Sequence, residues 1–287
     1  MLSEQTLYVV ATPIGNRDDM SARAIEVLNG VDRIYAEDTR HSLPLLRHHG
    51  IDTRVSAFHE HNEEAQVALV LDFLRTGRSA ALISDAGTPL INDPGYRLVR
   101  ACQQARIKVS PIPGACAVTA VLSVCGLPTD RFQFVGFAPH KRAARIAWLQ
   151  PVSNLEHTHI LYESPHRIVD CLTDIVEVYG DDREVCVARE LTKKFETVMC
   201  GTAAQILDRV SADANQQKGE FVIVIAGRAR TAELDGAGVA GVVELDRTLR
   251  VLLGYLPVKS AAKAAAELFS INKRDAYDRA LLLQDKQ

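Results

Sequence analysis

Three loops in the first half of the chain combine the residue types that a ligand-binding turn requires. Residues 11–16 and 84–95 each follow a short apolar run rich in β-branched residues, and residues 113–121 lead from another such run into a stretch of small side chains. Glycine lets the backbone approach a ligand closely, and small side chains leave room either for a flat group or for close helix–sheet packing. Because ligands bind at the carboxyl ends of strands in open α/β sheets, these loops predict a binding site there.

The loop at residues 84–95 carries the carboxylate with the clearest chemistry. Asp85 stands among glycines and prolines at a strand end, where it can accept hydrogen bonds from the hydroxyls or an amine of a ligand. The loop at 11–16 lacks the G-x-G-x-x-G pattern, which disfavours a dinucleotide. Charged segments at 162–167, 188–193 and 218–220 also border expected strands. They either converge on the same crevice or form charge pairs on the surface.

Histidines and cysteines in this chain do not form a pattern typical of a metal site. His59 and His61 flank Glu60, but on a strand they share one face without an evident third ligand, so no metal is expected. The six cysteines form no C-x-x-C pair, and most stand in apolar runs. We interpret them as small core residues of a protein in a reducing compartment, the cytoplasm.

Hydrophobic periodicity divides the chain into regions. Strands are expected at 7–11, 80–84 and 107–112, with helices at 22–28, 96–105 and 115–125. This alternation of strand and helix predicts an α/β domain over residues 1–127 with a parallel sheet covered on both faces. More closely spaced strands, at 131–136, 158–163, 184–190, 195–200 and 220–226, with helices at 167–179 and 203–210, predict a mixed sheet in a second α/β domain, 128–230.

A Gly- and Ala-rich linker is expected at 231–245, followed by a small helical domain over 246–287. Helices at 261–269 and 273–283, the second capped by Asn272, resemble a helix-turn-helix unit. This segment carries eight Lys or Arg against five Asp or Glu, on a chain whose net charge is −3. It is either a docking module for a polyanion or a hairpin that packs a dimer. No apolar run approaches the length of a membrane helix, and the first residues do not resemble a signal peptide.

Five motifs together resemble the ribosomal RNA small subunit methyltransferase I family. They are the segments that begin at Thr12 (TPIGN), Ala36 (AEDTR), Ser84 (SDAGTP), Tyr162 (YESPHR) and Arg189 (RELTK). The resemblance covers residues 6–227 and extends more loosely to the basic tail, where the family tends to have adjacent lysines and this chain has Val258-Lys259-Ser260. It implies a two-domain tetrapyrrole methylase-like fold, a cleft for S-adenosyl-L-methionine between the domains, and a homodimer. The implied reaction is 2′-O-methylation of a cytidine in the decoding centre of 16S rRNA.

The resemblance also assigns expected roles to individual residues. The cofactor contacts it implies are Pro13, Asp85, Thr88, Cys116, Ala117, Glu163, Leu191 and Glu220. A carboxylate or histidine is needed to take the proton of a ribose hydroxyl, and Glu37, Asp38, His59 and Glu163 stay open as candidates. For RNA we expect contacts from Arg40, Arg167, Lys259, Lys263, Lys273, Arg274 and Tyr277. The alternatives are a C-methyltransferase acting on a tetrapyrrole and a non-catalytic RNA-binding factor of ribosome assembly.

Overall fold

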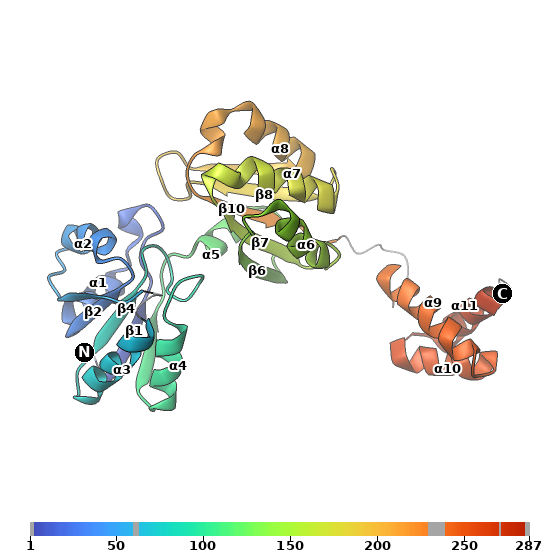
Figure 1. Cartoon of the computed structure of the whole chain (residues 1–287), viewed down its shortest axis with the longest axis horizontal. Coiled ribbons are helices and arrows are strands. Elements are labelled where there is room, and N and C mark those ends of the chain that lie inside the picture. Colours follow the sequence, from blue (N-terminus) through green and yellow to red (C-terminus); the bar gives the residue numbers. More distant parts are fainter. Residues whose placement is uncertain (1–2, 60–62, 229–238, 270, 285–287) are drawn as a thin grey trace. The chain divides into compact units, whose positions relative to one another are not determined.

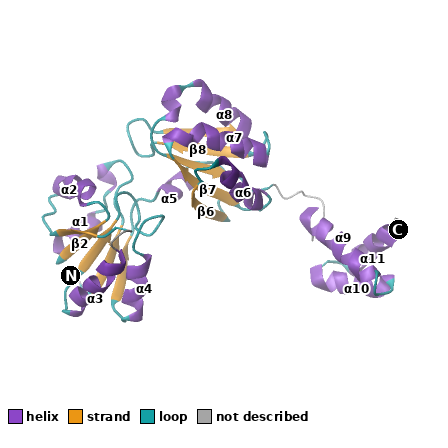
Figure 2. Cartoon of the chain, viewed as in Figure 1, coloured by secondary structure: helices purple, strands orange, loops and turns teal. Residues whose placement is uncertain are grey.

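The computed structural model describes residues 3–59, 63–228, 239–269 and 271–284, with the backbone alone for 239–243. The chain forms two compact units, Met1–Gly227 and Arg228–Gln287 (Figure 1). The larger unit contains two five-stranded sheets, and the smaller unit is helical (Figure 2).

The first sheet of the larger unit is entirely parallel. Its strands, in spatial order, are β3 (Val55–Ala57), β2 (Arg33–Ala36), β4 (Ala80–Ile83), β1 (Thr6–Val10) and β5 (Lys108–Ile112). Every neighbouring pair among them is parallel. The prediction of a parallel N-terminal sheet is therefore confirmed, although β2 and β3 were not among the expected strands.

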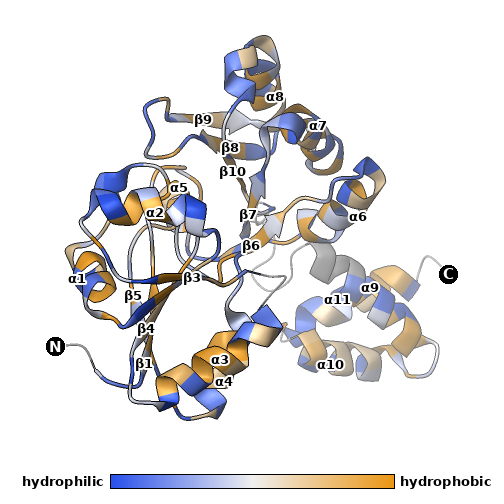
Figure 3. Cartoon of the chain, turned by 60° about the vertical axis from the view of Figure 1, so that its left-hand side comes forward, coloured by the Kyte–Doolittle hydropathy of each residue, from blue (hydrophilic) through white to orange (hydrophobic). Residues whose placement is uncertain are grey.

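Helices cover both faces of this sheet. The helices are α1 (Ala22–Gly30), α2 (Thr39–His48), α3 (Glu63–Arg75) and α4 (Tyr96–Gln104). Alternate strand residues separate into two cores: Ala81 and Ile83 pack with α1 and α2, whereas Leu82 packs with α3 and α4. Hydrophobic and hydrophilic residues accordingly follow one another around the turns of α1 and α2 (Figure 3).

The second sheet is mixed, as predicted. Its strands, in order, are β6 (Phe132–Phe137), β7 (Thr158–Glu163), β10 (Phe221–Ile225), β8 (Glu184–Arg189) and β9 (Thr197–Thr202). The pair β6–β7 is parallel and the other pairs are antiparallel. One face packs against α6 (Arg142–Ser153), α7 (Ile168–Tyr179) and α8 (Ala203–Ala212), and the other packs against α5 (Ala117–Leu122). Short 3₁₀ turns occupy Arg17–Asp19, Pro165–Arg167 and Ala214–Gln217.

A buried histidine in this sheet makes stability depend on pH. His159 of β7 is buried, and neither ring nitrogen has a hydrogen-bond partner among the described residues. Burial, with the charges of His157 and Arg183, lowers the pKa of His159 to about 4. The imidazole is therefore neutral in the folded state at pH values where the unfolded chain binds a proton. The contribution of the neutral His159 to the free energy of unfolding is therefore fully present above pH 6.5 and is lost as the pH decreases towards 4.

Replacing His159 by leucine is expected to flatten this pH dependence. The pKa of His159 is about 6.5 in the unfolded chain and lower in the folded protein. This difference corresponds to a decrease of up to roughly 3 kcal/mol in the free energy of unfolding of the parent protein between pH 6.5 and 4. Urea unfolding at several pH values measures it, with His166→Leu, an exposed histidine, as the control. Equal pH dependence in the two variants would contradict the prediction.

The described residues of the smaller unit form three helices, α9 (Val239–Leu253), α10 (Val258–Phe269) and α11 (Lys273–Gln284). They pack through leucines and a face of alanines that includes Ala262, Ala265 and Ala276. The N-cap expected at Asn272 is confirmed, since its Oδ1 accepts the Arg274 N–H at 2.9 Å. Because α9 begins at Val239, a helix covers the second half of the segment assigned to a linker; residues 231–238 lie outside the described residues.

The cysteines are all free thiols, and four of the six are buried. The core interpretation is wrong for Cys200, which is exposed because it lies on the edge strand β9. Cys116 is half-buried. No helix in the described part of the chain is long and apolar enough to span a membrane.

Candidate active site

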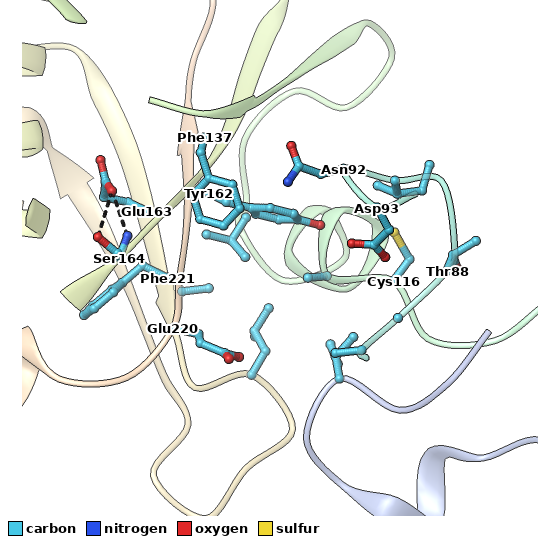
Figure 4. A pocket seen from close by; sticks show the side chains of 18 of the residues that line it. Thr88, Asn92, Asp93, Cys116, Phe137, Tyr162, Glu163, Ser164, Glu220 and Phe221 are labelled. Atoms are coloured by element: carbon cyan, nitrogen blue, oxygen red, sulfur yellow. Dashed lines mark hydrogen bonds between the residues drawn. The ribbon is translucent and has the colours of Figure 1, made fainter. Parts of the chain in front are cut away.

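A cleft of about 360 Å³ in the larger unit receives side chains from both sheets (Figure 4). The first half of the chain contributes Ile14, residues of the loop 84–95, and the start of α5. The second half contributes Phe137 and the strand ends near 162–165, 188–191 and 220–222. Most of the lining residues thus come from the loops at 84–95 and 113–121, from the three charged segments of the second half, and, through Ile14, from the loop at 11–16. Phe137 lies outside all of these segments.

Backbone hydrogen bonds hold the first-half loops in place. Thr12 and Gly87 exchange both N–H···O bonds, at 2.8 and 3.0 Å, and the Thr88 hydroxyl donates to the Ala115 carbonyl at 3.0 Å. Gly87 has φ +84°, a left-handed conformation that favours glycine. The Asn16 N–H donates to the Thr192 hydroxyl at 3.1 Å, which ties the first loop to the second half of the chain. These hydrogen bonds fix the positions of the loops that line the cleft.

The expected cofactor contacts separate into two groups. Six of them line the cleft: Thr88, Cys116, Ala117, Glu163, Leu191 and Glu220. The other two, Pro13 and Asp85, are not among its lining residues. Pro13 is buried, and the Asp85 carboxylate accepts the Asp38 N–H at 3.0 Å. A direct cofactor contact from these two stays a prediction.

Three carboxylates gather where β2 and β4 end. Burial first, and then the charges of Asp93 and Asp85, raise the pKa of Glu37. Burial and the charge of Asp85 also raise the pKa of Asp93, which lines the cleft. A carboxylate with a raised pKa holds a proton more readily, which is the property required of a general base near neutral pH.

The base candidates Asp38 and His59 fit this role less well. Asp38 forms a bidentate pair with Arg40, whose hydrogen bonds lower the pKa of this carboxyl to about 2. A carboxylate this acidic is a weak proton acceptor. His59 is half-buried and does not line the cleft, while Glu60 and His61 lie outside the described residues. In the part of the chain that the structure describes, no cluster of His, Cys, Asp or Glu could hold a metal ion.

Glu163 borders the cleft, but its carboxylate is directed away from it. Oε1 accepts the Ser164 N–H at 2.7 Å and pairs with the Arg167 guanidinium at 2.6 Å, and the side chain is fully buried. Figure 4 shows this carboxylate turned to Ser164 and away from Tyr162 and Asp93. Successive strand residues point to opposite faces, so Tyr162 faces the cleft and Glu163 does not. The geometry does not favour Glu163 as the base.

Arg167 is a structural partner of Glu163 in this geometry. Its Nε donates to the Ser164 hydroxyl at 3.0 Å, and its remaining nitrogens bond to the Ala138 carbonyl and to Glu163. The phosphate contact expected of Arg167 stays a prediction, but each of the three guanidinium nitrogens already bonds to a neighbouring residue. Arg40, by contrast, is exposed and held only by Asp38 among the described residues.

Replacing Arg167 and Arg40 by methionine is expected to affect stability differently. Arg167→Met leaves the buried Glu163 carboxylate without its cation, so the free energy of unfolding is expected to fall by about 2 kcal/mol. Arg40→Met, as the matched control, is expected to leave thermal unfolding unchanged because Arg40 is exposed. Thermal unfolding of both variants measures the difference. An Arg167→Met protein as stable as the parent would show that Arg167 does not act as a structural clamp.

Several cleft residues were not among the expected contacts, and those with polar or aromatic side chains include Asn92, Asp93, Phe137 and Tyr162. Asn92 and Asp93 belong to the Gly- and Pro-rich loop that was singled out, and they stand directly before its Pro94-Gly95 pair. Tyr162 precedes Glu163 in an expected strand. Applying the two-residue alternation of that strand would have identified the tyrosine as the side chain facing the opposite way.

The remaining RNA candidates belong to the smaller unit. Lys259, Lys263, Lys273 and Arg274 are exposed, and none of the four forms an ion pair with a described residue. Tyr277 is also exposed. Arg279 differs from them because it pairs in bidentate fashion with Asp246 of α9.

Comparison with known proteins identifies the family. Residues 6–207 match the model of the Tetrapyrrole (Corrin/Porphyrin) Methylases, and residues 239–284 match the RsmI C-terminal HTH domain. The ribosomal RNA small subunit methyltransferase I of Pseudomonas aeruginosa is 47% identical over 285 residues, 99% of this chain and 100% of that protein. The chain belongs to this family. The Escherichia coli O157:H7 protein of the same name is 46% identical over 97% of the chain and 96% of its own length.

Solved structures support the fold of this family member. Diphthine synthase has a TM-score of 0.59 at 15% identity, covering 78% of this chain and 90% of that one. The cobalt precorrin-4 methyltransferase has a TM-score of 0.56 at 17% identity, covering 78% and 95%. At this identity the likeness concerns the fold alone. Both the family resemblance and the fold class predicted from the motifs are confirmed.

Proposed function

We propose that the protein transfers a methyl group from S-adenosyl-L-methionine to the ribose 2′-hydroxyl of a cytidine in small-subunit rRNA. The observation that carries the proposal is the full-length similarity to the ribosomal RNA small subunit methyltransferase I family, combined with a cleft lined by loops from both halves of the larger unit. The similarity includes the helical unit, which is what separates this proposal from C-methylation of a tetrapyrrole.

The cleft residues fit such a cofactor. A volume of about 360 Å³ lies in the range of small-molecule sites. Ala188, Leu191 and Val222 form a buried apolar wall, and Thr88 and Glu220 add polar groups. These residues, with Cys116 and Ala117, would hold the cofactor. When bound, it supplies an electrophilic methyl group on a sulfonium, which needs no metal to activate it.

The chain's own residues then have to orient the hydroxyl and accept its proton. Positioning two reactants contributes up to about 7–11 kcal/mol to a reaction of this kind. Asp93 combines a place in the cleft with a raised pKa, and the pKa of Glu37 is raised partly by the Asp93 charge. We therefore add Asp93 to the candidate bases and place Glu37 behind it as the next of the original four.

The proposal includes a setting for the enzyme. The substrate is rRNA or the small ribosomal subunit in the cytoplasm, Lys259, Lys263, Lys273 and Arg274 of the helical unit contact RNA, and the enzyme acts as a homodimer. The charge of these helices and the family's helix-turn-helix match support the RNA contact. Arg40 is the exposed candidate for a phosphate contact in the larger unit.

Methyl transfer to isolated small subunits and to naked rRNA, with the modified nucleotide mapped, tests the function. The mapped methyl group is expected on a cytidine ribose. Ala117→Leu provides the link to the cleft: leucine preserves helix α5 but fills the site, so affinity for S-adenosylhomocysteine should fall by about tenfold or more.

Thr119→Leu on the exposed side of the same helix is the matched control and should retain that affinity. Calorimetry measures both variants. Methylation of a porphyrinogen with no transfer to rRNA would replace the proposed function by the tetrapyrrole one. A protein that binds RNA but not S-adenosylhomocysteine would indicate a non-catalytic factor.

A further inference from the structure

An irregularity in β6 directs an aromatic ring at the cleft. Phe134 pairs with Ile160 of β7, but the next paired residues are Phe137 and Tyr162, so three steps on β6 match two on β7. Gly136, with φ +73°, stands within this bulge. A bulge bends its strand and changes the direction of the next side chain. Phe137 consequently lines the cleft while 48% of the residue stays exposed.

The ring of Tyr162 packs against Phe137, and the ring of Phe134 packs in turn against Tyr162. The ring of Tyr162 lies 5.5 Å from that of Phe137 in an edge-to-face arrangement, and 4.7 Å from that of Phe134. Tyr162 packs in the core between α5 and the sheet, so its position is fixed. Figure 4 shows the adjacent side chains of Phe137 and Tyr162 facing the loop that carries Asn92 and Asp93. One face of this aromatic cluster therefore meets the open part of the cleft.

An amide stands beside the rings. Asn92 has φ +70°, a conformation that asparagine tolerates better than most residues, and its Oδ1 lies 3.0 Å from where a Cβ on Gly136 would be. The side chain has no hydrogen-bond partner among the described residues and is exposed. A free amide offers one acceptor and two donors in a plane, the arrangement that reads the edge of a base.

The cleft has an inner wall and a rim. Ala188, Leu191 and Val222 of the wall are buried, whereas Asn92 and Phe137 of the rim are exposed. A small cofactor fits against the wall, but a nucleotide that belongs to a polymer has to enter across the rim. A base presented there has left its stack in the RNA, and an aromatic side chain replaces the lost stacking.

We propose that Phe137, supported by Tyr162 and accompanied by Asn92, is the binding site for the base of the nucleotide whose ribose is methylated. The inference rests on the proposed function. Phe137 could stack on any planar nucleobase, including the adenine of the cofactor. The experiment therefore has to distinguish the RNA base from that adenine. Phe137 stacks on the base, and the Asn92 amide bonds to its polar edge.

The experiment compares full-length variants on small ribosomal subunits and with S-adenosylhomocysteine. Phe137→Ala is expected to raise the KM for the subunit by about tenfold or more, the effect of losing one stacked base. Its affinity for S-adenosylhomocysteine and its melting temperature should match the parent protein. Phe137→Tyr should restore the KM because the ring returns. Asn92→Gly, which tolerates the positive φ, should also raise the KM.

Phe132 offers a matched control. It lies on the same strand and is 47% exposed, but it does not line the cleft, so Phe132→Ala should behave as the parent protein. An equal effect of Phe132→Ala and Phe137→Ala would overturn the proposal. A fall in S-adenosylhomocysteine affinity in Phe137→Ala would also overturn it, because the ring would then hold adenine. A parent protein without transfer to rRNA refutes the proposed function, whereas an active parent with an unaffected Phe137→Ala refutes the base site alone.

Discussion

Replacing Asp174 by asparagine is expected to lower the free energy of unfolding by about 3–5 kcal/mol, the cost of breaking a buried ion pair. Asp174 of α7 is buried, and its Oδ2 lies 2.6 Å from the guanidinium of Arg145 of α6. The Arg145 side chain is only 3% exposed, so without the carboxylate its charge stays buried and unpaired. Asparagine preserves the size of the side chain, which leaves the lost charge as the main change.

The neighbouring ion pair supplies the control. Glu177 pairs with the exposed side of Arg142, and Glu177→Gln should cost less than about 1 kcal/mol. The double variant Arg145→Met/Asp174→Leu should recover much of the loss, since an apolar pair of similar volume replaces both charges. Urea unfolding with a constant m-value measures all three. If Asp174→Asn costs no more than Glu177→Gln, the pair does not stabilise the packing of α6 on α7.

This ion pair shows where sequence reasoning ends. Arg145 and Asp174 are 29 residues apart and on different helices, and nothing in either segment indicates that they meet. Helices α6 and α2 were not among the expected helices, and each contains a proline, Pro151 and Pro44 respectively. Prolines disfavour helix interiors. Both helices form because their apolar faces pack against a sheet, an effect that local propensity does not include.

The strands were predictable where burial is continuous. The runs that became β4 and β10 are buried along their whole length and are rich in aliphatic residues. The short strand β3 is only partly buried, and β2 includes Arg33, so neither has an apolar run of that kind. Both strands join the sheet because its parallel hydrogen bonding continues from β4 through β2 to β3, which is a property of the assembled sheet.

The candidate site was predictable at the level of loops and less so at the level of side chains. Composition alone located the loop at 84–95 and the start of α5, both of which line the cleft. It did not give the direction of Glu163, whose carboxylate bonds to Arg167, or the bulge that turns Phe137 into the cleft. Those directions depend on the register between β6 and β7, which are adjacent in space but separated by α6 in the chain.

The exposed cations on α10 and α11 of the helical unit are expected to give the largest functional effect. Substituting Lys259, Lys263, Lys273 and Arg274 by glutamine removes four exposed charges and leaves the alanine-lined core and the Asp246–Arg279 pair intact. If all four contact phosphates of single-stranded RNA, the log–log salt slope of binding should fall by about 0.7 for each contact, or roughly 3 in total. When the salt concentration rises from 50 to 200 mM, the RNA affinity of the parent protein should therefore fall by a factor about 50 times larger than that of the variant.

The same variant separates RNA docking from dimer packing. Apolar side chains are also exposed on this unit, among them Tyr255 at 85% and Leu268 at 69%, and a dimer contact would use those residues. The glutamine substitutions leave them unchanged, so light scattering should report the parent's oligomeric state and calorimetry the parent's affinity for S-adenosylhomocysteine. The same variant should have a higher KM for small subunits, together with its weaker salt dependence of RNA binding. If the salt slope is unchanged and the variant dissociates into monomers, the four substituted side chains belong to a dimer contact and not to an RNA contact. The reason is that removing phosphate contacts cannot alter the association of two protein chains.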